Sequence, residues 1–394
     1  MHENQKRITN LLLPTILLMS LSFSFSQNLS SNVLWDKKDN IPIAYATIKS
    51  EDKYTISNDD GVFKFEETFG KIKIQSVIYE TLEVDFDILK TKDTIFMKPL
   101  TFKLDEIVIS KDGLYTLMLK TVFSDYALEP HKENFFLRAV VRKNKDLYKI
   151  IDFSGKLEKK TLFDTRVKPM PKKNYKVQID NIRKVGIEDR NIDFKMFSFE
   201  QLFTHMIRLS FNKDLFDISY LTTVSKSYNK IILEPKDNST TKTKGYYILN
   251  KDKTFKEANI TYKNENAEFK KIGSGKYRTI FLNWKSNFDR NKASEKLQLN
   301  KGTITSKTEV YKSNGDKDIF DVEYIFYANP TSDVTDVNNN INLTKDMFYL
   351  RGTYNPEYWL KHEVLVLTKE MQEFINKVNS HGRNSDFRTK TNIN

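Results

Sequence analysis

The sequence predicts a mainly β fold, and two observations lead to that class. Short runs of apolar residues alternate with polar ones, as where Ile72 and Ile74 alternate with Lys71 and Lys73. This period of two is typical of strands that bury one face and expose the other. The composition agrees, because 28 Phe and 19 Tyr against 12 Gly and 9 Pro favour packed β structure over disorder. The length of 394 residues predicts two or three domains.

Residues 1–26 have the pattern of a secretory signal peptide. Lys6 and Arg7 supply the positive start, residues 11–25 the apolar run, and Ser26 a small residue before the cleavage site. An uncleaved anchor is the alternative, but the run is short of the ~20 apolar residues that a membrane span needs. We therefore expect an exported chain in the periplasm or at the outer-membrane periphery, with no transmembrane segment after signal cleavage.

The net charge limits the classes of partner to expect, and the cysteine count limits the possible sources of stability. The formal net charge is +12 and there is no cysteine. A basic exported protein can face anionic lipid head groups or acidic glycans, and nucleic acid is not an expected partner. The lysines are scattered singly, however, which favours an ordinary solvated surface over a dedicated anion site. Without disulfides, stability must come from burial and sheet hydrogen bonding.

Residues 27–110 predict a small β-sandwich. About seven short alternating strands fill this stretch, and Asp59, Asp60 and Gly61 form a turn signal in which Gly supplies a positive φ to close a hairpin. A calcium site at the same acidic residues is the less favoured reading, since Gly61 alone explains the cluster.

Four motifs in this stretch resemble the carboxypeptidase regulatory-like domain. They are residues 41–48 (I-P-I-A-Y-A-T-I), 57–63 (S-N-D-D-G-V-F), 74–80 (I-Q-S-V-I-Y-E) and 104–109 (L-D-E-I-V-I). The resemblance covers residues 32–110, roughly a fifth of the chain, and implies a transthyretin-like β-sandwich of the kind found in exported Bacteroidetes-type proteins. Ile78 departs from the family pattern, which usually has Gly before the Tyr.

A connecting helix is predicted within residues 111–130, because residues 113–127 carry apolar side chains at helical spacing and end before Pro130. Residues 131–379 then predict a β-rich C-terminal domain, and residues 380–394 a disordered tail. Ser198 and Gln201 form a capping box for one helix, and Thr368 caps another. Strands are expected at 135–141, 147–153, 231–233, 246–249, 258–262, 277–284, 302–311 and 321–327.

Successive hairpins of this length predict one large curved antiparallel sheet or half-barrel. In pattern it resembles the half-barrel of exported lipoprotein carriers, in which a curved sheet wraps a helix and shelters an acyl chain. Residues 354–359 also resemble an ending seen in uncharacterised Bacteroidetes proteins with the same first domain.

The sequence carries no catalytic signature. The His and Glu pair of a zinc carboxypeptidase, three residues apart, does not occur after any of the histidines His131, His205, His362 and His381. Gly273 and Gly275 flank Ser274 without the spacing of a nucleophile elbow, so a hairpin turn is the expected structure. We therefore predict no catalytic, cofactor-binding or metal-binding residues and no cofactor.

Aromatic side chains are the remaining candidates for ligand contact. Core packing or cross-strand pairing is the expected role of Tyr349, Trp284 and Phe281, of which the last two fall within the predicted strand 277–284. A possible ligand surface is formed by Tyr354, Tyr358 and Trp359, which we expect in a loop around Pro356.

Together these patterns favour a non-enzymatic exported envelope protein with a binding or scaffold role, its ligand a lipid, a glycan or a protein. Two alternatives stay open. One is a hydrolase with a carboxylate-based site in the C-terminal sheet, where two carboxylates would meet at roughly 5–10 Å if the bond cleaved is glycosidic. The other is an accessory protein of a TonB-dependent receptor.

Overall fold

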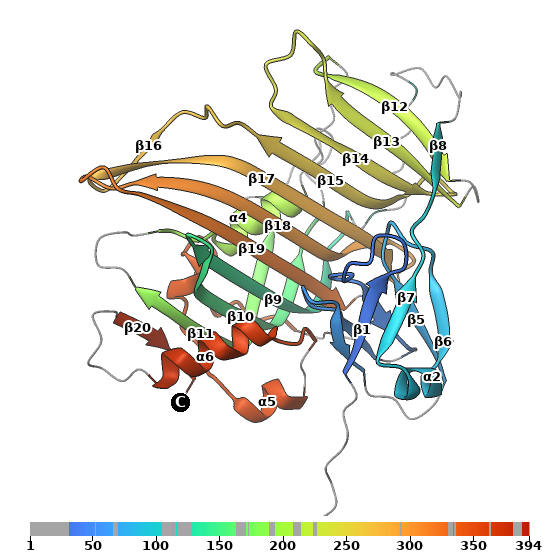
Figure 1. The fold of residues 1–394 in the computed structure, drawn as a ribbon, viewed down its shortest axis with the longest axis horizontal. Coiled ribbons are helices and arrows are strands. Elements are labelled where there is room, and N and C mark those ends of the chain that lie inside the picture. Colours follow the sequence, from blue (N-terminus) through green and yellow to red (C-terminus); the bar gives the residue numbers. More distant parts are fainter. Residues whose placement is uncertain are drawn as a thin grey trace, which may run out of the picture. The chain divides into compact units, whose positions relative to one another are not determined.

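The computed structural model in Figure 1 divides into two compact units. The N-terminal unit contains the described residues up to Gln75 and Thr81–Met97, and the C-terminal unit contains Ser76–Glu80 and the described residues from Lys98 onward. The described residues are 31–51, 53–65, 70–104, 113, 116, 126, 128–162, 171, 173–188, 194–207, 214–223, 227–291, 294–329, 334, 336–361, 364–380 and 388–393. The predicted signal peptide lies outside them.

The N-terminal unit is sandwich-like and consists of a three-stranded sheet, β4-β1-β7, and a four-stranded sheet, β3-β2-β5-β6. Alternate residues of the strands are buried, as with Ile72 and Ile74, because each strand turns one face inward. The elements are β1 Ser31–Asp36, β2 Thr47–Lys49, β3 Tyr54–Ile56, β4 Val62–Lys64, β5 Lys71–Gln75, β6 Leu82–Asp85, α2 Phe86–Thr91 and β7 Thr94–Met97.

The turn before β4 is present, but it does not close a hairpin. Gly61 has φ 74°, and the Asn58 side-chain oxygen accepts hydrogen bonds from the N–H groups of Asp60 at 3.0 Å and Val62 at 2.9 Å. The strands on either side pair elsewhere, β3 with β2 and β4 with β1. The turn therefore carries the chain from one sheet to the other, and the expected hairpin is wrong.

The N-terminal unit also ends earlier than the boundary predicted at residue 110. Its last strand, β7, ends at Met97. The following strand, β8 (Phe102–Leu104), pairs with β12 (Phe216–Thr223) in the sheet of the C-terminal unit. Pairing with a distant strand cannot be read from a local motif, which explains the difference. Residues 105–110 lie outside the described residues, as does most of the predicted connecting helix, of which Gly113 and Thr116 are helical.

The C-terminal unit is built on one large antiparallel sheet that stays open. Twelve strands follow one another in the order β20-β11-β10-β9-β19-β18-β17-β15-β14-β13-β12-β8, and β16 attaches to β17. This confirms the mainly β fold class with a large antiparallel sheet. The other strands are β9 His131–Lys143, β10 Asp146–Lys159, β11 Tyr175–Glu188, β13 Tyr228–Pro235, β14 Thr243–Asn250, β15 Phe255–Lys263, β16 Lys270–Ile272, β17 Gly275–Arg290, β18 Leu297–Tyr311, β19 Lys317–Asn329 and β20 Arg388–Thr391.

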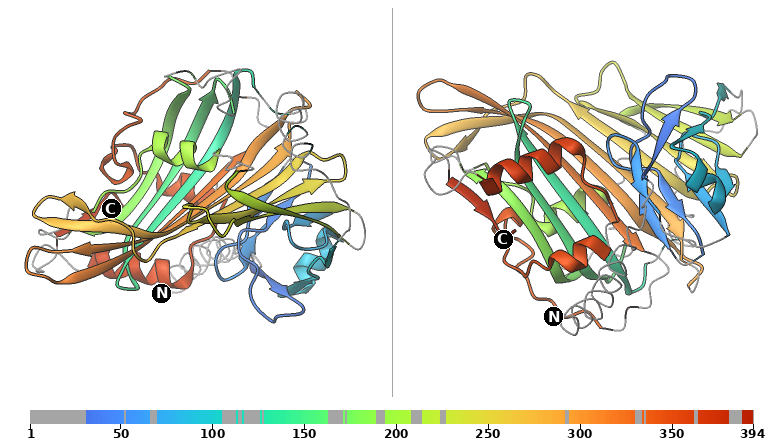
Figure 2. Two further views of the ribbon diagram at one scale, coloured as in Figure 1. Left: turned by 90° about the horizontal axis from the view of Figure 1, so that it is seen from above. Right: turned by 60° about the horizontal axis from the view of Figure 1, so that its bottom comes forward.

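Helix α4 (Phe199–Met206) covers part of the inner face of this sheet (Figure 2). The predicted capping box starts it, with the Ser198 side chain accepting from the Gln201 N–H and the Gln201 side chain accepting from the Ser198 N–H. Its apolar side chains Phe199 and Phe203 are fully buried in a core shared with the strands. Eight residues of helix span only about 12 Å, whereas the 15 residues of β18 span about 50 Å. A helix this short leaves part of the inner face uncovered.

Helix α6 (Lys369–Ser380) packs on the opposite, outer face of β9–β11 (Figure 2). Thr368 caps it as predicted, accepting the Met371 N–H at 3.2 Å. Its apolar stripe includes Phe374 and Val378, which contact Val140 and Ile150 in one buried cluster. Two shorter helical elements precede it, a 3₁₀ turn at Met347–Tyr349 and α5 at Pro356–Lys361. No helix in the described part of the chain is both long and apolar enough to cross a bilayer.

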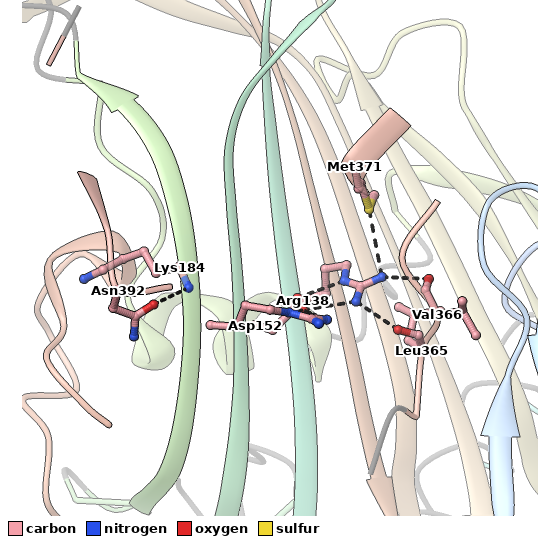
Figure 3. A network of polar contacts seen from close by, with 8 residues as sticks. Arg138, Asp152, Lys184, Leu365, Val366, Met371 and Asn392 are labelled. Carbon is pink, nitrogen blue, oxygen red and sulfur yellow. Dashed lines mark hydrogen bonds and ion pairs between the residues drawn. The ribbon is translucent and has the colours of Figure 1, made fainter. Parts of the chain in front are cut away.

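A buried charge cluster joins the chain at Leu365 and Val366, just before α6, to strands β9–β11 of the sheet (Figure 3). The Asp152 carboxylate on β10 is fully buried and accepts hydrogen bonds from Arg138 at 2.8 and 3.1 Å and from Arg183 at 2.6 and 2.9 Å. Burial opposes the charge of Asp152, but the two guanidinium groups outweigh it and lower its pKa below the ordinary value. Arg138 also donates to the carbonyl oxygens of Leu365 and Val366, which fixes the chain just before α6.

The predicted disordered tail at residues 380–394 is wrong for its last part. Strand β20 pairs antiparallel with β11, and the Asn392 side chain bonds the backbone of Ile182 at 2.8 Å and of Lys184 at 2.7 Å. The polar composition that suggested disorder suits an edge strand, because one side of such a strand faces water. Residues 381–387 lie outside the described residues.

Lys184 on β11 is a buried cation whose titration affects stability. Its Nζ donates to the carbonyl oxygens of Phe348 at 3.1 Å and Leu350 at 2.9 Å. Burial, followed by the nearby charge of Lys390, lowers the pKa of Lys184 to about 8. Between about pH 8 and the ordinary value of 10.5, the unfolded chain therefore holds a proton that the native state has released.

Stability should rise with pH through that window where this group dominates, because the unfolded state binds more protons. We expect the free energy of unfolding of the wild type, relative to Lys184→Met, to be constant below pH 8 and to increase from pH 8 to 10.5. Urea denaturation of both proteins across pH 6–10.5 measures this difference. A difference that stays flat or falls across the window would contradict the expected effect of burial.

Candidate ligand cleft

The inner face of the C-terminal sheet is hollowed where α4 leaves it uncovered. The cleft has a volume of about 1390 Å³. Its floor comes from β15, β17, β18 and β19, and its walls come from α4, residues 194–197 and the loop at 264–273. Ligand sites in proteins commonly measure about 300–1,000 Å³. This cleft is therefore large enough for an extended molecule.

Strand alternation decides which residues reach the cleft. Near the start of β17 the residues Tyr277, Arg278 and Thr279 line it, and after a β-bulge between Thr279 and Phe281 the lining residues are Leu282 and Trp284. The extra residue in the bulge moves the inward positions from odd to even numbers. Phe281 consequently lies on the opposite face, where it lines a smaller cleft of about 630 Å³.

Four aromatic rings follow one another along the cleft. The Tyr324 and Phe197 rings stack at 5.2 Å and 5°, Phe197 stacks on His205 at 5.1 Å, and His205 lies 6.4 Å from Trp284. The Tyr324 hydroxyl accepts the Phe197 N–H at 2.7 Å, and burial raises the Tyr324 pKa well above its ordinary value. The hydroxyl therefore stays protonated at neutral pH and fixes the Phe197 backbone beside the sheet.

Hydroxyl groups interrupt the apolar lining. Ser306 and Thr308 on β18 occupy inward positions next to Val310, and Thr279 faces Thr308 with their hydroxyl oxygens 3.2 Å apart. Such positions would carry apolar side chains if the inner face were packed as a core throughout. The mixture of apolar, aromatic and hydroxyl groups suits a ligand that is itself amphipathic.

Charged side chains reach the cleft mainly from its walls. Lys195, Lys270 and Lys271 are exposed cations on the segments that border it. Two carboxylates also line it, Glu268 and Asp346. The Asp346 carboxylate accepts the N–H groups of Met196 at 2.9 Å and Phe348 at 2.8 Å, so both of its oxygens stabilise the backbone of the wall.

The residues predicted as a ligand surface lie elsewhere. Trp359 is buried on α5, with its ring 4.9 Å from the Arg183 guanidinium and 6.3 Å from the Phe136 ring. Tyr358 is half-buried and its hydroxyl bonds the Ser154 side chain, while Tyr354 is half-buried before the helix. None of the three lines the cleft, and the expected loop around Pro356 is a helix. Their predicted contact with a ligand stays a prediction.

The sequence indicated Trp284 as an aromatic candidate but gave no sign that Phe197 and His205, the latter considered only as a possible zinc ligand, lie beside it. These two lie on a connecting segment and on α4, and only the packing of α4 on the sheet brings them to Trp284. The feature of the sequence that could have indicated a cleft is the pair of hydroxyl residues, Ser306 and Thr308, at inward positions of β18. Among the described residues, no three His, Cys, Asp or Glu side chains are grouped so that they could hold a metal ion.

No family model and no curated protein matches this chain. Two solved structures resemble it only weakly. One is a conserved protein of unknown function with a hot dog fold from Alicyclobacillus acidocaldarius, at 10% identity over 56% of this chain and 88% of that chain, with a TM-score of 0.10. The other is a mutant porin of Rh. blastica, at 9% identity over 50% of this chain and 99% of that chain, with a TM-score of 0.11. At these scores neither supports an argument about fold or function.

Proposed function

We propose that this protein is a non-enzymatic binding protein of the cell envelope whose inner cleft holds an amphipathic lipid. The observation that carries the proposal is the cleft of about 1390 Å³ beside α4, with its apolar and aromatic floor and its exposed lysines. The export part of the proposal rests on the signal-peptide pattern of residues 1–26.

The chemistry of the lining supports a lipid ligand. Leu282, Val310 and Val322 offer an apolar surface to an acyl chain, since removing such chains from water is favourable by about 0.8 kcal/mol per CH₂. Lysines in the cleft walls can approach a phosphate or carboxylate head group at the solvent side. The layout, a curved sheet that partly encloses a helix, is also the one expected from the resemblance to lipoprotein carriers.

Leu282 provides a sharp test because its neighbour is a matched control. Both Leu282 and Phe281 are half-buried on β17, but only Leu282 lines the inner cleft. We expect Leu282→Asp to weaken binding of a fluorescent fatty acid by at least about tenfold, because a buried carboxylate disfavours an apolar chain beside it. Phe281→Asp should stay within about twofold of the wild type in the same fluorescence titration. The proposal fails if the wild type binds neither fatty acid nor lysophospholipid, or if both variants lose binding equally.

A glycan is the second candidate ligand, and the aromatic row from Tyr324 to Trp284 is the observation that favours it. Phe197 and His205 are the partly exposed rings of this row, and aromatic and hydroxyl groups suit sugar rings as well as acyl chains. Competition distinguishes the two, because an envelope oligosaccharide that displaces the fluorescent fatty acid at comparable concentration would favour the glycan.

Within the larger cleft, the hydrolase alternative would require Glu268 and Asp346 to act as a pair, since these are the two carboxylates among its lining residues. Asp346 already accepts two backbone hydrogen bonds, so we favour binding over hydrolysis. The role as an accessory of a TonB-dependent receptor rests on the resemblance of the N-terminal unit alone.

A further inference from the structure

Beside residues that line the cleft, the tips of two hairpins carry an exposed aromatic ring among cations. Phe269 is 42% exposed and precedes β16, which pairs with the start of β17. Its ring meets the ring of Tyr311 at the end of β18, with centroids 5.3 Å apart and nearly perpendicular planes. The contact holds the β16–β17 hairpin against the β18–β19 hairpin, and Figure 1 shows both at the same end of the sheet. We call Phe269, Lys270, Lys271, Lys276 and Tyr311 the tip.

The tip is cationic. The Lys276 Nζ lies 4.5 Å and the Arg278 guanidinium carbon 4.8 Å from the centre of the Phe269 ring. Lys270 and Lys271 are exposed, and within the described part of the chain neither forms an ion pair with a carboxylate.

The ion pairs beside the tip also leave a surplus of positive charge. Glu309 is shared by two cations, Arg278 and Lys317. Asp318 is likewise shared by Lys143 and Lys312. Two exposed carboxylates, Glu268 and Asp316, reduce the excess without cancelling it.

We infer that the tip docks on the surface of an anionic phospholipid bilayer. An exposed aromatic ring flanked by lysines is the combination that proteins place at the membrane interface, where the ring enters the head-group region and the ammonium groups meet anionic lipids. A Lys at the surface of an anionic leaflet strengthens binding by about fivefold. Two to three lysines and one inserted ring therefore give a weak, reversible attachment to the bilayer. Such an attachment allows the protein to bind the membrane and leave it repeatedly.

The position of the tip gives this docking a consequence for the cleft. Lys270, Lys271 and Ile272 belong both to the tip region and to the lining of the cleft. A tip resting on a bilayer therefore places this part of the cleft lining at the head groups, where an amphipathic lipid could pass between protein and membrane. Docking itself does not depend on the proposed cleft ligand, so the two can be tested separately.

Vesicle co-sedimentation tests the docking with variants of the full mature chain. We expect the wild type to bind phosphatidylglycerol-containing vesicles at least about tenfold more tightly than pure phosphatidylcholine vesicles, and to lose this preference at about 0.5 M salt. Lys270→Glu with Lys271→Glu should weaken the binding about tenfold or more, and Phe269→Ser about five- to tenfold.

Matched controls come from helices α5 and α6 of the same unit. Leu360 on α5 is 84% exposed, and Lys361 on α5 and Lys369 on α6 are exposed cations. Leu360→Ser and the pair Lys361→Glu with Lys369→Glu should bind vesicles within about twofold of the wild type.

Three outcomes would overturn the inference: no preference for anionic vesicles, equal losses in the control variants, or no response to Phe269→Ser and the charge reversal. A partner protein at the tip would give the first of these. Fatty-acid binding distinguishes this failure from failure of the proposed function, because Phe269→Ser should keep it and Leu282→Asp should keep vesicle binding.

Discussion

Replacing Asp152 with Asn should cost about 3–5 kcal/mol of unfolding free energy, which is the range for breaking a buried ion pair by removing one partner. The side chain is fully buried and is shared by Arg138 and Arg183, whose exposed fractions are 1% and 9%. The amide would be nearly the same size, so the loss would come from two buried guanidinium groups left without a counter-charge. Urea denaturation followed by circular dichroism measures the change.

An exposed ion pair of the same sheet serves as the control. Lys307 and Asp321 lie 3.4 Å apart with side chains 45% and 38% exposed, so Asp321→Asn should cost less than about 1 kcal/mol. Equal losses for the two variants would mean that solvent reaches Asp152 and that the cluster is not sealed. Because Arg138 also bonds the carbonyls of Leu365 and Val366, we expect α6 to become more accessible to protease in Asp152→Asn.

Phe203→Ala should destabilise the protein by about 3–5 kcal/mol, as large-to-small changes of buried aromatic residues do. Phe203 has no exposed surface, and its ring contacts the rings of Tyr175 at 4.9 Å and Phe326 at 5.4 Å. These contacts hold α4 on the sheet, and few other residues of so short a helix can replace them.

The neighbouring Thr204 is the matched control, because it lies on the exposed side of α4. Thr204→Ala should change stability by about 0.5 kcal/mol or less. Thermal unfolding of both variants beside the wild type is sufficient, and a Phe203→Ala protein with an unchanged midpoint would show that α4 contributes little to the fold.

Local features of the fold could be predicted from the sequence. The eight strands expected between residues 135 and 327, the cap at Ser198 and the cap at Thr368 all depend on residues within a few positions of one another, and these predictions are confirmed. The strands β11 and β12 are not among those expected. Hydrophobic periodicity and capping residues indicate the secondary structure that one segment prefers. These segments adopt that preferred secondary structure in the folded chain.

Non-local pairing could not be predicted. The turn at Gly61 is present as predicted, yet the strand after it, β4, does not pair with β3. It pairs with β1, about 30 residues earlier, while β3 pairs with the adjacent β2. The same holds for β8, which joins β12, and for β20, which joins β11 across about 200 residues. The pattern of residues within one strand does not show with which other strand it will pair.

The candidate site shows the same limit. The sequence identifies Trp284 as an aromatic candidate but does not show which face of the sheet it lies on. A bulge after Thr279 reverses the alternation of inward and outward side chains, and the sequence does not reveal this bulge. The aromatic row exists only because α4 and residues 194–197 fold back over that strand. The aromatic row therefore depends on tertiary packing that no local sequence pattern predicts.

The two edges of the large sheet have a consequence for the behaviour of the protein at high concentration. An open sheet ends in unpaired backbone groups that can recruit strands from other molecules and start aggregation. One of these edges is β20, which carries Lys390 and pairs with β11 on one side. A lysine on an edge strand opposes pairing with the same strand of a second molecule, because two ammonium groups would be brought together.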